Sequence, residues 1–279
     1  MLKGSIVVVL SDDKEKALEV AGRLGKKEEE KMYYRHKDDI LRTVLTPDGL
    51  LEAAEFITLS TYYYLYITGA NSNSAELALL AKASGLRGVV LADDVEAFRK
   101  YFGELGLELG ELEEVDITPE DVGYIYIERA FNVKGVGPVA IGFTYTHVGL
   151  HEKLVALPSG IEVDVKSIQV LDEDQEEVGP GVRVGIALRG IELDALKDSY
   201  ILVKRDVPLT DRYKAVKFKW ASEAEKAHVF IGGIRAMATI KGQEAVLDKK
   251  VPAVLKRGVV VNVNAKPKTS KTYGYVYKD

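Results

Sequence analysis

The 279-residue sequence contains no cysteine. This absence excludes disulfide bridges, zinc–thiolate sites and a cysteine nucleophile. No apolar run comes near the roughly 20 residues that a membrane-spanning helix needs, and residues 1–6 enter a strand-like pattern rather than that of a signal peptide. We therefore expect a soluble, cytoplasmic protein that does not associate with a membrane.

Histidine is scarce, with four residues in all. His147 and His151 have a spacing that would place two zinc ligands on one face of a helix, but residues 148–150 between them predict a hairpin turn, where helical spacing does not apply. The acidic segment 172–177 lacks the glycine and the terminal glutamate of a calcium loop, and we interpret it as a solvated turn. The sequence predicts no metal site and no cofactor.

Charge, in contrast, is abundant and unevenly distributed. Residues 1–205 carry 23 basic and 36 acidic residues, a net charge of −13, whereas residues 206–279 carry 15 and 7, a net charge of +8. A basic region on an acidic protein orients it toward phosphate-rich surfaces. Solvated lysines on a small domain would give the same count, so both interpretations stay open.

Residues 1–115 alternate between strand and helix patterns. The run 5–10 is continuously apolar, as in a strand covered on both faces. Asp12 and Asp13 then cap a helix that ends near Gly25. This alternation indicates a parallel sheet with helices on its faces. The other expected elements are strands at 40–45, 62–68, 88–91 and, at an edge, 112–117, helices from Leu50 onward and at 74–84 and 93–102, and a solvated loop at 26–31.

Between residues 131 and 205 apolar residues recur at every second position, which indicates half-buried strands. Glycines inside such strands, here Gly142 and Gly185, are tolerated where a sheet bends or where another backbone comes close. Short strands of this kind predict a small closed barrel. The two apolar sets are Val182, Val184, Ile186 and Leu188 on one strand and Val139, Ile141, Phe143 and Tyr145 on another.

A second all-β unit is expected after a linker at 204–209. Its alternating tyrosines, Tyr273, Tyr275 and Tyr277, suit stacking on nucleic-acid bases or, more commonly, packing within the barrel. The expected strands lie near 216–220, 228–232, 237–240, 259–263 and 273–277.

Three motifs in the first all-β region occur in the order found in a known family. They are Gly-Val-Gly-Pro-Val-Ala-Ile-Gly at 135–142, Lys-Ser-Ile-Gln at 166–169 and Arg-Val-Gly-Ile-Ala-Leu-Arg-Gly at 183–190. This region resembles domain 2 of the EF-Tu-like translational GTPases and is most similar to SelB, the selenocysteine elongation factor, in a degenerate archaeal form. Residues 228–232 resemble the third domain of these factors more weakly.

The resemblance implies a multidomain α/β and all-β fold. A degenerate P-loop-GTPase-like α/β domain would span residues 1–118, an EF-Tu domain 2-like β-barrel residues 119–206, and a domain 3-like β-barrel residues 207–279. In the family, domain 2 helps to hold the aminoacyl end of tRNA and contacts the ribosome.

The residues that perform GTP chemistry in the family are not found at the matching positions. Where a P-loop needs glycines and a lysine, the chain has residues 11–16, with the carboxylates of Asp12 and Asp13. The magnesium acid and the histidine of the second motif match Thr46 and Leu50, and the guanine-reading motif matches 91–94, whose aspartates, Asp93 and Asp94, are interpreted as helix N-caps. We expect a pseudo-GTPase with no nucleotide-binding and no catalytic residues.

These observations favour a non-catalytic, SelB-like elongation-factor relative that associates with tRNA, ribosomal RNA or the ribosome. Two alternatives stay open: a protein-interaction or homodimer scaffold that reuses the former nucleotide face, and an atypical GTP-binding factor. The RNA contacts are predicted in the basic C-terminal domain, at Lys256, Arg257, Lys266, Lys268 and Lys271.

Overall fold

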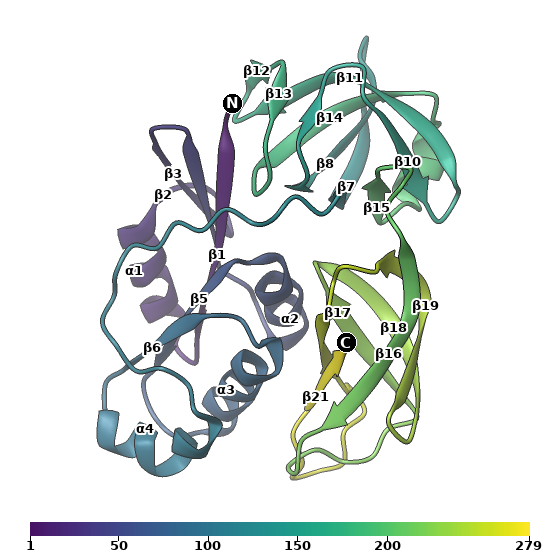
Figure 1. Cartoon of the computed structure of the whole chain (residues 1–279). Helices are drawn as coiled ribbons and strands as arrows, with labels where there is room; N and C mark the ends of the chain where they lie inside the picture. The colour runs from purple at the N-terminus through teal and green to yellow at the C-terminus, as the bar shows by residue number, and fades with distance from the viewer.

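The computed structural model describes residues 1–279 and shows an α/β domain, at the left of Figure 1, followed by two closed β-barrels. Barrel 1 lies at the top and barrel 2 at the lower right. A cluster of 68 buried residues runs through all three parts, so their cores are continuous. None of the helices has the combination of length and apolar character that crossing a bilayer requires.

The α/β domain contains a six-stranded sheet in the order β2-β3-β4-β1-β5-β6. The last four strands in this order are parallel, as the alternation of strands and helices predicts. Asp13 caps the first helix and Gly85, in the left-handed conformation, ends the third, so these predicted signals are confirmed. The elements are β1 Lys3–Ser11, α1 Lys14–Leu24, β2 Lys26–Glu29, β3 Met32–Lys37, β4 Ile40–Leu45, α2 Leu50–Leu59, β5 Tyr62–Ile67, α3 Ser72–Ser84, β6 Gly88–Ala92, α4 Val95–Phe102 and the 3-10 helix η1 Gly103–Leu105.

Two expectations for this domain are wrong. The predicted loop at 26–31 contains β2, which pairs with the unexpected strand β3. All four residues of β2 are exposed, so this edge strand has no apolar pattern to reveal it. The predicted edge strand at 112–117 does not form. In this region only Leu109 pairs with the sheet, through an isolated bridge to Val90.

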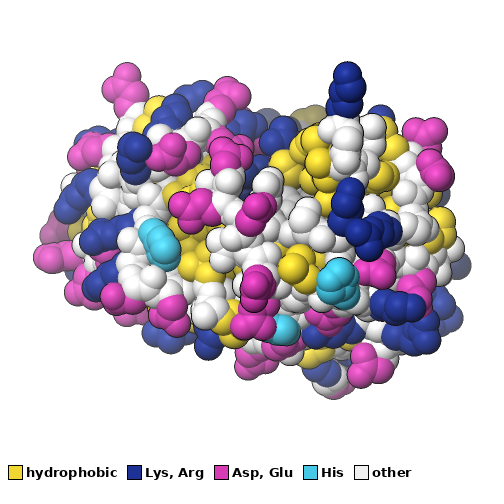
Figure 2. Space-filling model, turned by 90° about the horizontal axis from the view of Figure 1, so that it is seen from above, with side chains coloured by type: hydrophobic (Ala, Val, Ile, Leu, Met, Phe, Trp, Pro, Cys, Tyr) yellow, Lys and Arg dark blue, Asp and Glu magenta, His cyan; other side chains and the backbone are white.

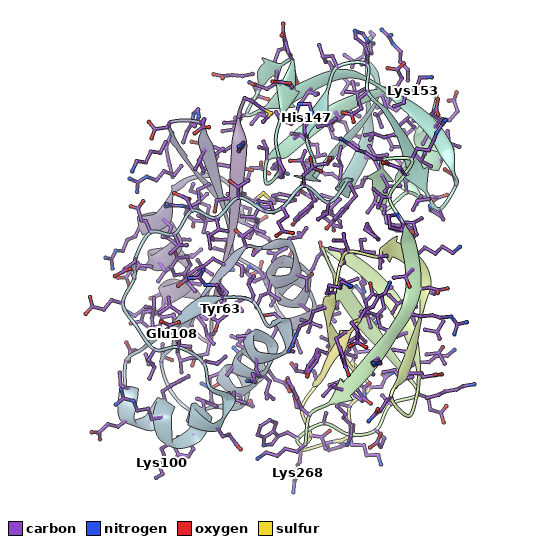
Figure 3. All side chains as sticks on the ribbon, viewed as in Figure 1. Tyr63, Lys100, Glu108, His147, Lys153 and Lys268 are labelled. Carbon is purple, nitrogen blue, oxygen red and sulfur yellow. The ribbon has the colours of Figure 1, made fainter.

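The segment 106–123, which we call the connector, is held instead by side chains of the sheet. Arg42, whose side chain is 2% exposed, donates to the carboxylates of Asp116 and Glu114. The Tyr64 hydroxyl donates to the carbonyl of Glu113. Figure 3 shows Glu108 of the connector beside the sheet that carries Tyr63.

Barrel 1 is a ring of six strands in the order β10-β15-β7-β8-β14-β11, which the pairing of β11 with β10 closes. The predicted closed barrel is therefore confirmed. The acidic segment 172–177 is not a simple turn, because part of it pairs with β11 as β12. The elements are β7 Tyr124–Val133, β8 Gly137–Tyr145, β9 Val148–Gly149, β10 Lys153–Leu157, β11 Ile161–Val170, β12 Glu173–Gln175, β13 Glu177–Val178, β14 Arg183–Arg189, α5 Leu193–Lys197 and β15 Ile201–Val203.

The two apolar sets predicted for this barrel lie on opposite faces of its wall. Val184, Ile186 and Leu188 are at most 2% exposed and fill the interior. On the neighbouring strand, Ala140 pairs with Ile186 and therefore shares the interior face. Val139 pairs with Ala187 and lies with the rest of its set on the other face. This set therefore faces outward, where Phe143 and Tyr145 are buried against the α/β domain and Val139 and Ile141 stay partly exposed.

The two strand glycines of barrel 1 have different roles. A Cβ at Gly142 would lie 1.7 Å from the carbonyl oxygen of Tyr126, so the predicted close backbone approach is confirmed there. A Cβ at Gly185 would meet no atom within 4 Å. Gly185 thus leaves open space on the outer face of the barrel.

Barrel 2 closes through six strands in the order β16-β19-β18-β17-β20-β21. β19 was not expected, and Trp220, predicted to lie in a strand at 216–220, lies in a turn because β16 ends at Lys217. Tyr273 is buried, whereas Tyr275 and Tyr277 are partly exposed and contact each other. The strands are β16 Leu209–Lys217, β17 Lys226–Ile231, β18 Ile234–Lys241, β19 Glu244–Pro252, β20 Arg257–Val261 and β21 Thr272–Tyr277.

Candidate functional site

A hollow of about 350 Å³ lies at the carboxyl ends of the parallel strands of the α/β domain. β1 has β4 on one side and β5 on the other, so this is the region in which doubly wound sheets bind ligands. Its lining includes Ser11, Asp12, Lys14 and Asp48. The hollow therefore lies where the resemblance to GTPases would place a nucleotide.

The two aspartates after β1 are both engaged within the domain. Asp12 accepts hydrogen bonds from the backbone N–H and hydroxyl of Thr68 at 2.9 and 3.0 Å and from the side-chain amide of Asn71 at 2.9 Å. Asp13 accepts from the backbone N–H of Lys16 at 3.0 Å and so caps α1. The carboxylates of Asp12 and Asp13 thus bind donors of the α/β domain itself.

Ion pairs surround the mouth of this hollow. Lys31 contacts Glu52 at 2.8 Å and Asp48 at 3.4 Å, and Lys14 contacts Asp48 at 3.5 Å. The hydrogen bond to Glu52 raises the pKa of Lys31, and that from Lys31 lowers the pKa of Asp48. The lysines are therefore paired with the protein's own carboxylates.

The other positions matched to GTPase motifs have local structural contacts. The Thr46 hydroxyl donates to the carbonyl of Lys31 at 3.1 Å. Asp94 caps α4, as expected, but Asp93 does not cap a helix; it accepts a hydrogen bond from the hydroxyl of Tyr66 at 2.6 Å.

A second hollow, of about 640 Å³, lies on the outer face of barrel 1, and we call it the barrel hollow. Strands β7, β8, β14 and β11 form its floor and walls, and the open space at Gly185 lies on that floor. Phe131, Val136 and Leu171 on its walls are 37%, 37% and 49% exposed. Figure 2, which looks down on this end of the molecule, shows apolar side chains gathered between charged ones.

Polar and charged side chains line the barrel hollow together with the apolar ones. Arg183 donates to Glu128 at 2.8 Å, to Glu29 at 2.5 Å and to the hydroxyl of Tyr34 at 3.1 Å, which neutralises its charge. Burial raises the pKa of Tyr34 to about 12, so this phenol stays neutral. Arg129, stacked over the ring of Phe131 at 5.9 Å, is exposed at the rim. Glu28 and Glu29 of β2 and Asp172 also line the hollow, so its rim carries charges of both signs around an apolar area.

The five predicted RNA-contact residues do not form one patch. β20 and β21 are antiparallel, so Lys256 and Arg257 lie at one end of this pair and Lys266, Lys268 and Lys271 at the other. Arg257 donates to the carbonyls of Ala83 and Lys82 at the end of α3, which makes it an interdomain contact. The three lysines are exposed, and Figure 3 shows Lys268 at the lower end of barrel 2.

The paired histidines do not come together at a site. His147 contacts Glu177 at 2.9 Å, while His151 lies in a turn with a φ of 65°. No group of three or more His, Asp or Glu side chains is arranged to hold a metal ion.

Comparisons with known proteins show which proteins the chain is similar to. No family model matches it. The selenocysteine-specific elongation factor of Methanocaldococcus jannaschii is 36% identical over 167 residues, which cover 55% of this chain and 36% of that protein. The chain is homologous to the SelB and EF-Tu-like translational GTPases. Elongation factor 1-alpha of Desulfurococcus mucosus is 26% identical over 174 residues, covering 56% of this chain and 40% of that factor.

An uncharacterized Methanocaldococcus jannaschii protein is 28% identical over 149 residues, 51% of this chain and 47% of that protein. The matches thus span less than half the length of these three relatives. Among solved structures, SelB of Methanococcus maripaludis with the GTP analogue GPPNHP has a TM-score of 0.75 at 14% identity over 100% of this chain and 79% of that one. A bacterial EF-Sec has a TM-score of 0.77 at 14% identity over 99% of this chain and 58% of that one.

The SelB-like fold confirms the predicted succession of an α/β domain and two barrels. Sequence reasoning missed the barrel hollow, although Val139 and Ile141 belong to a recognised apolar set. The available signal was the run of apolar residues around the tight Gly135–Gly137 turn, which a hairpin exposed to water would not require.

Proposed function

We propose that this protein is an elongation-factor-like protein that holds the aminoacylated 3′ end of a tRNA in the barrel hollow and does not use GTP. The observation that carries the proposal is the open floor at Gly185, inside the motif that resembles domain 2 of the family. In the family, this domain helps to hold the aminoacyl end of tRNA. Homology to SelB and elongation factor 1-alpha supports a role of this class.

The chemistry of the barrel hollow supports the same ligand. A terminal nucleotide with an attached aminoacyl group presents a flat base and an uncharged ester, and it fits a volume of several hundred cubic ångströms. Phe131, Val139 and Ile141 offer apolar contact area, Ser167 and Gln169 offer hydrogen bonds, and Arg129 at the rim can pair with a phosphate.

The test fills the floor of the hollow. A Cβ at Gly185 would have no neighbour within 4 Å, and the φ of Gly185 is not positive. Gly185→Leu is therefore sterically allowed and places a side chain in the binding space. We expect fluorescently labelled, aminoacylated tRNA to bind the wild type and to bind G185L at least about tenfold more weakly. Deacylated tRNA should bind the wild type more weakly than aminoacylated tRNA.

Gly22→Leu is the matched control, because Gly22 on α1 also has no neighbour within 4 Å and lies far from this barrel in the fold. G22L should bind like the wild type, and neither variant should lower the melting temperature. Equal affinity of G185L and G22L for aminoacylated tRNA would reject the hollow as the site.

The absence of GTP use is supported by the electrostatics of the strand-end hollow. Asp12 accepts hydrogen bonds from the backbone N–H and the hydroxyl of Thr68 at the end of β5. The negative charges of Asp12 and Asp13 would repel a triphosphate. Removing Asp12 from Thr68 would also leave a partly buried backbone donor without its partner.

Isothermal titration calorimetry tests this part separately. With about 100 μM GTP and excess magnesium we expect no binding heat, while aminoacylated tRNA binds the same preparation without nucleotide. A micromolar isotherm for GTP would refute the nucleotide-free mechanism and leave the tRNA site standing.

A further inference from the structure

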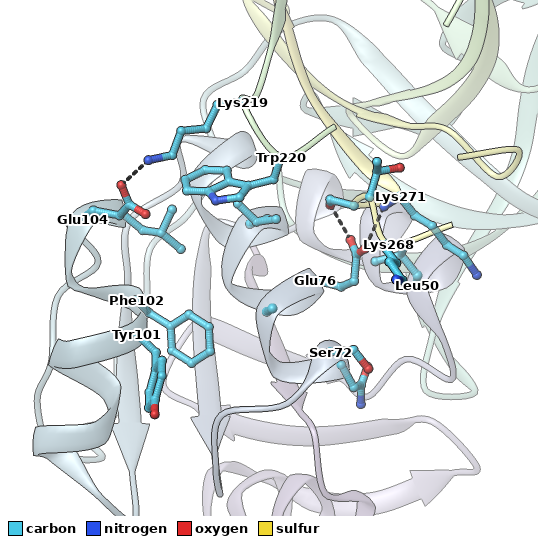
Figure 4. Close-up of a pocket in the computed structure, with 16 residues that line it drawn as sticks. Leu50, Ser72, Glu76, Tyr101, Phe102, Glu104, Lys219, Trp220, Lys268 and Lys271 are labelled. Atoms are coloured by element: carbon cyan, nitrogen blue, oxygen red, sulfur yellow. Dashed lines mark hydrogen bonds and ion pairs between the residues drawn. The ribbon is translucent and has the colours of Figure 1, made fainter. Parts of the chain in front are cut away.

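A cleft of about 920 Å³ separates the α/β domain from barrel 2. One wall is formed by α3, α4 and η1, and the other by the turn around Trp220 and the loop 266–271 (Figure 4). Two contacts cross it: Lys219 donates to Glu104 at 2.5 Å, and Glu76 accepts from the backbone N–H groups of Lys271 and Thr272 at 2.7 and 2.9 Å. These contacts link the two walls of the cleft.

Aromatic rings on both walls reach solvent. Trp220 on the barrel wall is 37% exposed, and Tyr101 on α4 is 56% exposed. Figure 4 shows Trp220 between the two crossing contacts, with Tyr101 and Phe102 on the facing wall. Exposed rings of this kind provide flat surfaces on which bases stack without regard to sequence.

The net charge of the cleft is positive. Glu104 is paired with Lys219, whereas Glu76 binds neutral backbone N–H groups and keeps its negative charge. Lys268 and Lys271 are exposed and form no ion pair. The turn Lys266–Thr269, closed by a hydrogen bond from the N–H of Thr269 to the carbonyl of Lys266, places Lys268 at its tip.

We propose that this cleft binds a short segment of single-stranded RNA, with a base stacked on Trp220 and phosphates paired with Lys268 and Lys271. Hydroxyl and amide groups of Ser72 and Asn73 on the α3 wall offer hydrogen bonds to sugar or base. The combination of exposed rings, free lysines and short polar side chains favours RNA over a protein segment. The site is separate from the barrel hollow and does not depend on the function proposed above.

Trp220 is the only tryptophan in the chain, so its fluorescence reports on the cleft directly. We expect an eight-nucleotide oligouridylate or oligoadenylate to quench this emission in full-length protein at low salt. Lys268→Ala/Lys271→Ala should weaken binding at least about tenfold and reduce the slope of log K against log salt by about 1.4, since each phosphate contact on a single strand contributes about 0.7.

Lys241→Ala/Lys250→Ala is the matched control, because both lysines are exposed on barrel 2 and neither lines the cleft. It removes the same charge and should retain the wild-type salt slope. Trp220→Ala, followed by anisotropy of a labelled oligonucleotide, should abolish most of the binding, and Trp220→Phe should restore part of it.

Three results would overturn the proposal: no quenching by either oligonucleotide, equal loss in the two lysine pairs, or quenching by an acidic peptide but not by RNA. The last would assign the cleft to a protein partner. G185L should leave the quenching unchanged. The experiments therefore distinguish a failure of the cleft proposal from a failure of the tRNA site proposed in the barrel hollow.

Discussion

Glu55 illustrates how single side chains set the properties of the contact between α2 and barrel 1. Its carboxylate accepts a hydrogen bond from the hydroxyl of Tyr126 at 2.7 Å. Burial raises the pKa of Glu55, and this hydrogen bond only partly opposes the effect. Glu52 and Glu128 nearby add to the rise. The folded protein therefore binds a proton at this position more tightly than the unfolded chain does.

Glu55→Gln should consequently stabilise the protein at neutral pH. Because the folded-state pKa of Glu55 is raised, protonated Glu55 contributes fully to the free energy of unfolding at pH values below the ordinary carboxyl pKa. This contribution is lost as the pH rises through the folded-state pKa. Gln keeps the acceptor for Tyr126 without the charge. We expect a higher melting temperature for E55Q than for the wild type at pH 7.5 and no such gain at pH 4.

Glu120→Gln, on an exposed position of the connector, serves as the control and should not change the melting temperature at either pH. A lower melting temperature of E55Q at pH 7.5 would contradict the assignment of a raised pKa to Glu55.

At the scale of elements, the connector shows how a segment without regular structure is fixed. Beyond Arg42 and Tyr64, its backbone is held by β6, since the N–H of Val90 donates to the carbonyl of Glu108 at 2.7 Å. The N–H of Ile117 donates to the hydroxyl of the buried Ser5 at 3.1 Å. Four separate contacts along its length thus replace the ladder that a strand would provide.

Arg42→Ala should release the middle of the connector. Removing one partner of a buried ion pair leaves the other without compensation, which costs about 3–5 kcal/mol, and the partial exposure of Glu114 and Asp116 puts the loss at the lower end. We expect a loss of about 3 kcal/mol in urea unfolding and faster cleavage by a glutamate-specific protease at 111–114.

Arg35→Ala provides the comparison, because Arg35 forms an exposed pair with the same Glu114. Its cost should stay below about 1 kcal/mol, as for other surface pairs. Equal protease sensitivity of R42A and the wild type would show that Arg42 does not hold the connector.

At the scale of the whole molecule, polar contacts at both ends of α3 join barrel 2 to the α/β domain. Glu76 near the start of the helix accepts from backbone N–H groups of barrel 2. Arg257 binds carbonyls at the helix end and stacks on Tyr275, with its guanidinium 3.6 Å from the ring centre. Barrel 1 is joined to the α/β domain by separate contacts, among them the hydrogen bonds from the N–H of Gly4 to the carbonyl of Pro180 and from the hydroxyl of Tyr126 to Glu55.

Arg257→Ala should therefore uncouple barrel 2 from the rest. It leaves carbonyls at the end of α3 without their partner, at a cost of about 1–3 kcal/mol. We expect a single calorimetric transition for the wild type and two transitions for R257A, with barrel 2 melting first. Lys256→Ala, at the neighbouring exposed position, should keep a single transition, and a single transition in R257A as well would exclude this coupling.

Much of the fold could be predicted from local signals. The alternation of strands and helices, the Asp13 cap and the Gly85 stop are contained in short windows of sequence, and each was placed correctly. β2 could not be found, because its four exposed charged residues carry no period and its pairing is supplied by the backbone of β3. Arg257 was predicted to contact RNA, a charge-based prediction that took no account of α3 beside it.

The sequence by itself determined the succession of an α/β unit and two barrels, because hydrophobic period and caps are local properties of the chain. It also placed Asp12 and Asp13 where a phosphate cradle would lie. Only the tertiary structure decided which face of each strand points inward, since a shift of one residue exchanges the faces. That choice turned Val139 and Ile141 outward beside Gly185 to form the barrel hollow, and the docking of barrel 2 on α3 brought Trp220 opposite Tyr101.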